Sequence, residues 1–85
     1  MKLDRDIKQF ILRALCRAKE EPINDDTLRQ LVRGAFAHVA ITEADLSQWI
    51  KELETGGLIS GTTDELFGLT WGLSLAGKHK AQQLR

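Results

Sequence analysis

The chain has 85 residues, of which 42% are hydrophobic and 28% charged, and its twelve basic residues balance its twelve acidic ones. These totals are typical of one small globular domain over residues 1–85, and they exclude attraction to nucleic acid or to an anionic membrane through overall charge. A single cysteine excludes a fold held together by disulfides within the chain.

Nothing in the sequence predicts export or membrane insertion. The N-terminal residues, MKLDRDIKQF, lack the apolar core of a signal peptide. The longest uncharged stretch, residues 66–77, is shorter than the ~20 apolar residues that a membrane helix needs. We therefore expect a cytoplasmic protein without membrane contact.

The first two thirds of the chain predict three helices, each with one apolar side. Pro22 ends the first helix, because the residue before a proline avoids the helical region. Asn24 and Thr42 are placed to cap the second and third helices, and Gly56-Gly57 to end the third. The apolar positions that predict the buried sides are Ile7, Phe10, Ile11, Ala14, Leu15, Ala18, Leu28, Leu31, Val32, Ala35, Phe36, Leu46, Trp49, Ile50 and Leu53.

After the third helix the spacing of the apolar residues changes. Residues 57–60 predict one strand, residues 61–65 a loop, and residues 66–73 a second strand in which every other residue from Phe67 is large and apolar. Ser74 is placed to cap a short final helix. The predicted fold class is therefore α+β, with a three-helix core, a two-stranded β-hairpin and a C-terminal helix.

Two motifs in this order indicate a family. Residues 46–59, LSQWIKELETGGLI, are similar to a recognition helix and its exit, which often ends L-E-x-x-G-L-I. Residues 73–77, LSLAG, match the pattern L-[ST]-x-x-G that closes a β-hairpin wing and opens a terminal helix. Together they resemble the winged-helix family, the helix-turn-helix variant with a hairpin wing, over nearly the whole chain.

The resemblance implies a small transcriptional regulator that binds duplex DNA with its third helix in the major groove. It implies that Ser47, Gln48 and Lys51 of that helix read base edges, and that Thr62 and Thr63 of the wing contact the DNA. To these we add Arg29 and Arg33 of the second helix as anchors on the DNA backbone. Hydroxyl, amide and ammonium groups suit base edges or phosphates. The alternative for all of them is plain solvent exposure on polar surfaces.

The charge pattern favours a different partner. Between Thr42 and Gly68, six acidic residues stand against Lys51 alone, although phosphate neutralisation supplies most non-specific DNA affinity. Residues 1–41 carry eight basic and six acidic groups, and residues 69–85 carry three basic and no acidic ones. The alternative function is therefore a protein–protein interaction module on the same scaffold, with its acidic third helix and apolar wing against a basic partner.

Two apolar pairs are candidate partner surfaces. Leu12 and Cys16 are four residues apart on the first helix, outside its main apolar stripe, so they either form a homodimer or partner seam or are covered by the terminal helix. Leu66 and Phe67 follow Asp64 and Glu65 near the wing tip, which is a composition suited to a protein-facing wing.

The sequence holds no recognisable catalytic frame. It lacks a glycine-rich phosphate loop and a nucleophile elbow, and its two histidines and one cysteine form no ligand cluster. Trp49 and Trp71 occupy positions predicted to face the core, which favours packing over base stacking. We expect no enzyme activity, no metal and no cofactor.

Overall fold

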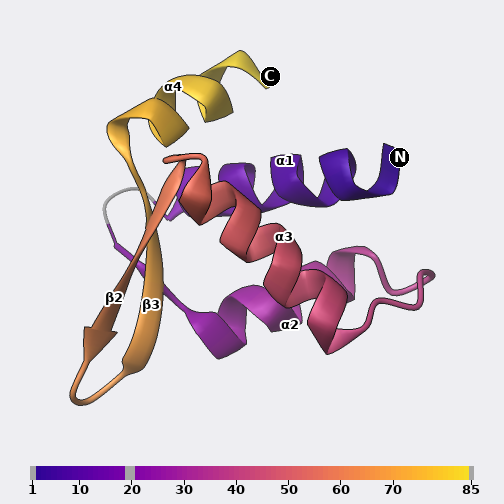
Figure 1. Cartoon of the computed structure of the whole chain (residues 1–85), viewed down its shortest axis with the longest axis horizontal. Helices are drawn as coiled ribbons and strands as arrows, with labels where there is room; N and C mark the ends of the chain where they lie inside the picture. The colour runs from indigo at the N-terminus through magenta and orange to yellow at the C-terminus, as the bar shows by residue number, and fades with distance from the viewer. Residues whose placement is uncertain (1, 19–20, 85) are drawn as a thin grey trace.

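The structure is a computed structural model that describes residues 2–18 and 21–84. Within these residues it has four α-helices and a three-stranded antiparallel sheet, which confirms the α+β class and is compatible with a winged helix-turn-helix layout. The β2–β3 hairpin extends away from the helices (Figure 1). The elements in chain order are α1 (Lys2–Arg17), β1 (Ile23–Asn24), α2 (Asp25–Ala35), α3 (Glu43–Thr55), β2 (Ile59–Asp64), β3 (Gly68–Leu73) and α4 (Leu75–Gln83).

Three of the helices begin at the capping residues that the sequence predicts. The side-chain oxygens of Asn24, Thr42 and Ser74 each accept a hydrogen bond from a backbone N–H two or three residues further on, at 2.9, 3.1 and 3.0 Å. Each bond satisfies one of the first N–H groups of a helix, which have no partner inside the helix itself. Gly57 follows α3 with φ +76°, the left-handed conformation predicted for a glycine at a helix end.

The hairpin differs from the prediction in its length and turn. Residues 61–64, predicted as a loop, belong to β2 and pair with Gly68–Trp71. The turn is therefore only residues 65–67, and Leu66 and Phe67 lie in it rather than in a strand. The physical reason is that the threonines of this segment favour extended backbone, and that Gly68, at φ +74°, permits a tighter turn.

The third strand of the sheet, β1, was not predicted. Its two residues lie antiparallel to β3, with Ile23 opposite Trp71 and Asn24 opposite Thr70, so the strand order is β1-β3-β2. Two residues cannot show an alternating pattern, which is why the sequence gives no sign of this strand. β1 joins the start of α2 directly to the hairpin.

The core is one cluster to which every helix contributes. Buried leucine, isoleucine and valine side chains of α1, α2 and α3 meet Ile59 and Trp71 of the hairpin and Ala81 of α4. Trp49 is half-buried and packs against this cluster, as expected for a core-facing position. Leu31, at 42% exposure, and Ala35 are exposed, although both were predicted to be buried, because α2 turns that edge toward solvent.

The two motifs that resemble the winged-helix family lie against each other. The Ser74 hydroxyl donates to the Gly57 carbonyl oxygen at 2.5 Å, and the Ser74 backbone N–H donates to the Leu58 carbonyl oxygen at 3.1 Å. A Cβ atom on Gly77 would lie 1.9 Å from the same Leu58 oxygen, so only glycine lets α4 approach this closely. The glycines and the serine of the motifs therefore join the end of α3 to the start of α4.

Within the described residues, none of the helices has the length and apolar character required to cross a bilayer.

Candidate functional site

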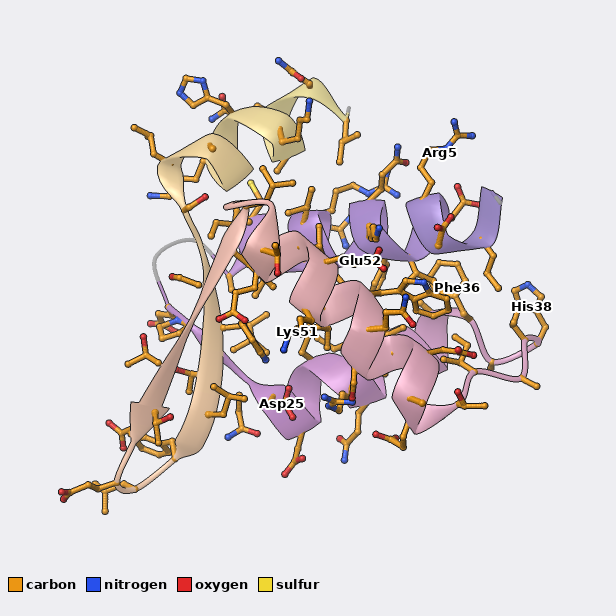
Figure 2. The ribbon with its side chains drawn as sticks, viewed as in Figure 1. Arg5, Asp25, Phe36, His38, Lys51 and Glu52 are labelled. Carbon is orange, nitrogen blue, oxygen red and sulfur yellow. The ribbon has the colours of Figure 1, made fainter. Side chains whose placement is uncertain are left out.

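The predicted reading residues form one exposed strip on α3. Ser47, Gln48 and Lys51 are all exposed, and their spacing along the helix places them on neighbouring turns of the same side. In the view of Figure 2, Lys51 projects to the hairpin side of α3 and Glu52 to the α1 side. The Gln48 side-chain amide donates a hydrogen bond to Glu52 at 3.1 Å. The strip thus offers the Lys51 ammonium group, with the Glu52 carboxylate on the next residue of the helix.

Glu52 links α3 to α1. The Lys8 ammonium donates to its Oε1 at 2.5 Å, and this bond, aided by the Gln48 amide, holds the pKa of the Glu52 carboxyl below its ordinary value. Lys8 is therefore occupied within the molecule. The bond also shows that Glu52 finds its cation on a neighbouring helix.

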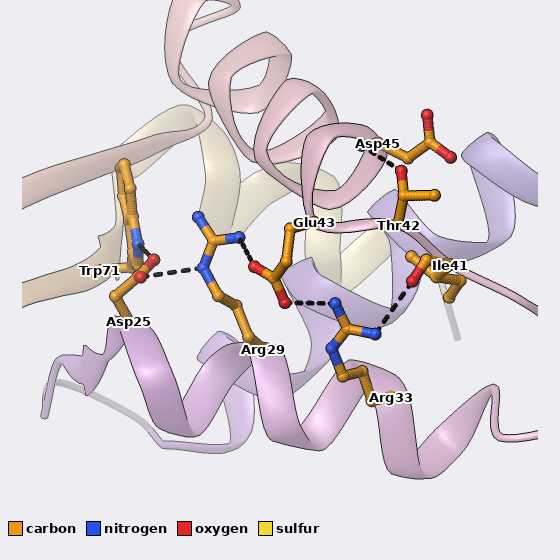
Figure 3. Close-up of polar contacts among 8 residues, drawn as sticks. All are labelled: Asp25, Arg29, Arg33, Ile41, Thr42, Glu43, Asp45 and Trp71. Atoms are coloured by element: carbon orange, nitrogen blue, oxygen red, sulfur yellow. Dashed lines mark hydrogen bonds and ion pairs between the residues drawn. The ribbon is translucent and has the colours of Figure 1, made fainter.

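Arg29, predicted as a DNA backbone anchor, is held in two ion pairs. Its Nε donates to Asp25 Oδ2 at 2.9 Å, one turn earlier in α2, and its Nη1 donates to Glu43 Oε2 at 3.1 Å, at the start of α3. Its side chain is only 20% exposed. Figure 3 shows the guanidinium lying between the two carboxylates. The positive charge of Arg29 therefore stabilises the contact between α2 and α3.

Arg33, the second predicted anchor, completes this network. Its Nη1 donates to the Ile41 carbonyl oxygen at 2.9 Å, and its Nη2 donates to the other oxygen of Glu43 (Figure 3). One carboxylate, Glu43, thus bridges both arginines across the turn between the helices. The sequence indicates only the Asp25–Arg29 pair, through its i,i+4 spacing; the role of Glu43 depends on how α3 packs.

The predicted wing residues lie on the strand and not at the loop. Thr62 and Thr63 are exposed positions of β2, before the turn. Thr62 is fixed in the ladder, where its carbonyl oxygen accepts a hydrogen bond from the Thr70 hydroxyl at 3.2 Å. The outermost part of the hairpin is instead apolar, because Leu66 is 87% and Phe67 67% exposed.

Three hydrogen bonds hold the turn that carries these two side chains. Asp64 Oδ1 accepts hydrogen bonds from the backbone N–H groups of Leu66 at 2.7 Å and Phe67 at 3.0 Å. The Asn24 amide, from the start of α2, donates to the Phe67 carbonyl oxygen. We name residues 64–67 the hairpin tip. It is an ordered platform that presents two large apolar side chains beside two carboxylates.

Both members of the pair on α1 lie on the side of that helix that faces α4. Leu12 is 3% exposed and lies between α1 and α4, so the terminal helix covers it, as one of the two interpretations expects. Cys16 is a half-buried free thiol that packs against the core, and it lines a pocket with Ala81 and Gln82 of α4. Leu12 is therefore part of the fold and not an exposed seam.

The surface charge around α3 is strongly acidic. Residues 21–68, which comprise β1, α2, α3 and most of the hairpin, contain nine acidic and three basic groups. Two of the three basic groups, Arg29 and Arg33, are held by Glu43 and Asp25. Lys51 is thus the one cation of this segment without an ion pair in the part of the chain that the structure describes.

Among residues 2–18 and 21–84, no three histidine, cysteine, aspartate or glutamate side chains are grouped so that they could hold a metal ion.

Comparisons of the chain with protein-family models, with curated proteins and with solved structures give no match.

Proposed function

We propose that this chain is a winged helix-turn-helix domain that serves as a protein-binding module, and that the hairpin tip is its binding surface. The order of helices and strands and the β1-β3-β2 sheet support the winged-helix assignment. The observation that carries the function is the pair Leu66 and Phe67, exposed at the outermost point of the hairpin on a turn held by hydrogen bonds.

The tip has the physical properties of an anchor. Full burial of a leucine or phenylalanine side chain stabilises a complex by roughly 1.5–3 kcal/mol. A turn that is already ordered loses little conformational freedom on binding, so more of this free energy remains as affinity. Asp64 and Glu65 beside the apolar pair favour a partner whose apolar pocket has a basic rim.

The same surface is a poor match for DNA phosphates. Non-specific DNA affinity comes from lysine and arginine contacts, and the segment that would lie on the duplex has three basic groups against nine acidic ones. Arg29 and Arg33 would have to leave Asp25 and Glu43 before they could bind phosphate. An apolar tip with two carboxylates would face the backbone where a wing normally meets it.

The test compares proteins captured by the wild-type chain with those captured by Leu66→Ser and Phe67→Ser, from nuclease-treated lysate of its own cells. Leu31→Ser is the matched control, since Leu31 is an exposed leucine on α2, away from the hairpin. We expect partners that both tip variants lose and that Leu31→Ser keeps. Identical capture by all four proteins would remove the assignment of the tip.

A second candidate function, DNA reading by α3, is favoured by the exposed strip of Ser47, Gln48 and Lys51. Fluorescence anisotropy with a duplex pool tests it, using Gln48→Ala and Lys51→Ala. If Lys51 is the one phosphate contact, affinity falls only about fourfold between 50 and 200 mM salt. Binding that both substitutions abolish would favour DNA over protein as the partner of α3; binding unaffected by either would exclude this face.

A further inference from the structure

A groove on the opposite side of the molecule has an apolar floor. It lies between α1, α4 and the end of α3, and its volume is about 510 Å³. Its apolar lining consists of the half-buried Leu58 and Leu84, with Leu12 and Leu53 beneath them at 3% and 4% exposure. This volume is within the range of about 300–1,000 Å³ found for pockets that hold a small molecule, so it has room for one or two protruding side chains.

The rim of this groove is basic. Arg5, Lys8 and Lys80 lie along it, and Asp4 is the acidic residue among its lining side chains. Arg5 is exposed and projects from α1 to the side on which α4 lies (Figure 2). Lys8 is paired with Glu52, so Arg5 and Lys80 supply the positive charge available to an incoming group.

The charges of the chain are segregated in space. Among the described residues, 2–18 carry five basic and two acidic groups, and 69–84 carry two basic and none acidic. The two helices of these segments, α1 and α4, pack against each other, whereas the acidic segment 21–68 forms β1, α2, α3 and β2. Figure 1 shows the hairpin tip at the far end of the hairpin from α4. The net charge of zero therefore conceals a basic end and an acidic end.

We propose that the hairpin tip of one copy binds in the groove between α1 and α4 of a second copy. Leu66 and Phe67 lie against the leucine floor, and Asp64 and Glu65 face Arg5 and Lys80. The two surfaces are complementary: one end carries an apolar pair with an acidic flank, and the other an apolar groove with a basic rim. This inference rests on the proposed function of the tip and names a second copy of the chain as its partner.

A contact of this kind has a defined salt dependence. The carboxylates and the basic groups lie at the margin of the contact, so dissolved salt screens them, while burial of the apolar pair is little affected. A tip of four residues makes a small interface, of the size found in weak and transient encounters. We expect self-association at micromolar to millimolar concentration that weakens as salt is added.

Analytical ultracentrifugation of the full chain over that concentration range tests the proposal. One variant, Phe67→Asp, disables the tip and leaves the groove intact; another, Arg5→Glu with Lys80→Glu, disables the rim and leaves the tip intact. Arg13→Glu is the control, because Arg13 is an exposed arginine of α1 that does not line this groove. Circular dichroism verifies that each variant is folded.

We expect the wild type and Arg13→Glu to self-associate, and each disabled variant to sediment as a monomer. A mixture of the two disabled variants should form a one-to-one complex, because one supplies the groove and the other the tip. A wild type that stays monomeric at millimolar concentration overturns the inference, as does self-association that survives Phe67→Asp. If partners of the tip are nevertheless captured from lysate, the proposed function stands and only the second copy is rejected.

Discussion

The indole Nε1 of Trp71 donates a hydrogen bond to Oδ1 of Asp25 at 2.8 Å, and this bond joins β3, the central strand of the sheet, to the first turn of α2. Trp71 is buried, and its N–H would lack a partner without this carboxylate. The other oxygen of Asp25 accepts from Arg29, so the carboxylate connects the hairpin to the ion pairs between α2 and α3. The orientation of the hairpin relative to the helices therefore depends on Asp25.

We expect Asp25→Ala to lower the free energy of unfolding by about 1–3 kcal/mol, because it leaves a buried indole N–H without its acceptor and leaves the partly buried Arg29 guanidinium with Glu43 alone. Urea denaturation measures this loss. Asp26→Ala is the control: Asp26 is exposed in the same helical turn, and its loss should cost less than about 1 kcal/mol. Equal losses for the two variants would show that the contact with Trp71 contributes nothing.

Gly77 is a position where only glycine fits. A Cβ there would lie 1.9 Å from the Leu58 carbonyl oxygen, so Gly77→Ala should force α4 away and destabilise the fold by about 1–3 kcal/mol. Gly34→Ala is the contrast, since Gly34 lies in α2 with nothing within 4 Å of the added methyl group. That change should stabilise by about 0.5–1 kcal/mol through helix propensity. Thermal unfolding that ranks the two in the reverse order would contradict the packing of α4.

The stability contribution of Glu52 depends on pH. Lys8 lowers the pKa of this carboxyl in the folded state from its ordinary value of 4.5. A lowered folded-state pKa means that the contribution is complete above the unfolded-state pKa and is lost as the pH falls through the folded-state pKa. Glu52→Gln should therefore destabilise the protein at neutral pH and have no effect in strong acid.

A titration of the Glu52 carboxyl by NMR in the wild type and in Lys8→Ala measures the cause directly. The pKa should rise toward 4.5 when Lys8 is removed, because the hydrogen bond from Lys8 is the largest cause of the lowered pKa. An unchanged pKa would show that the Lys8–Glu52 pair does not form in solution.

Substitution of Phe67 should leave the fold intact. Its side chain is two-thirds exposed, and the turn is held by Asp64 and Asn24 through backbone groups of the tip that a substitution retains. We expect Phe67→Ser to change the free energy of unfolding by no more than about 0.5 kcal/mol. Chemical denaturation verifies this. A loss above that value would mean that Phe67 packs within the fold, which would remove the physical basis of the hairpin tip as a binding surface.

The helices and their ends were predictable because their signals are local. Asn24, Thr42 and Ser74 cap the helices that follow them, and Gly57 ends α3 in the left-handed conformation, since each of these preferences acts within one turn. The hairpin turn was misplaced because its limits depend on pairing across strands. A strand as short as β1 cannot be read from periodicity, because only its contact with β3 defines it.

In the candidate site too, features set by local sequence were predictable, and features set by contacts between elements were not. Exposure of Ser47, Gln48 and Lys51 follows from helical spacing on α3, so the sequence predicts it. The engagement of Arg29 and Arg33 does not, because Glu43 reaches both only once α3 has packed beside α2. The sequence shows Leu66 and Phe67 as an apolar pair near the wing tip. It does not show that both side chains lie outside the core and are exposed.

The most direct test of the hairpin tip as a protein-binding surface is site-specific photocrosslinking in living cells. The photoreactive amino acid p-benzoylphenylalanine replaces Phe67 in one sample and Leu31 in a second, so that the crosslinker lies at the tip or on α2. The account predicts discrete protein adducts at position 67 that are absent at position 31. Adducts to nucleic acid alone, or the same adducts from both positions, would contradict it.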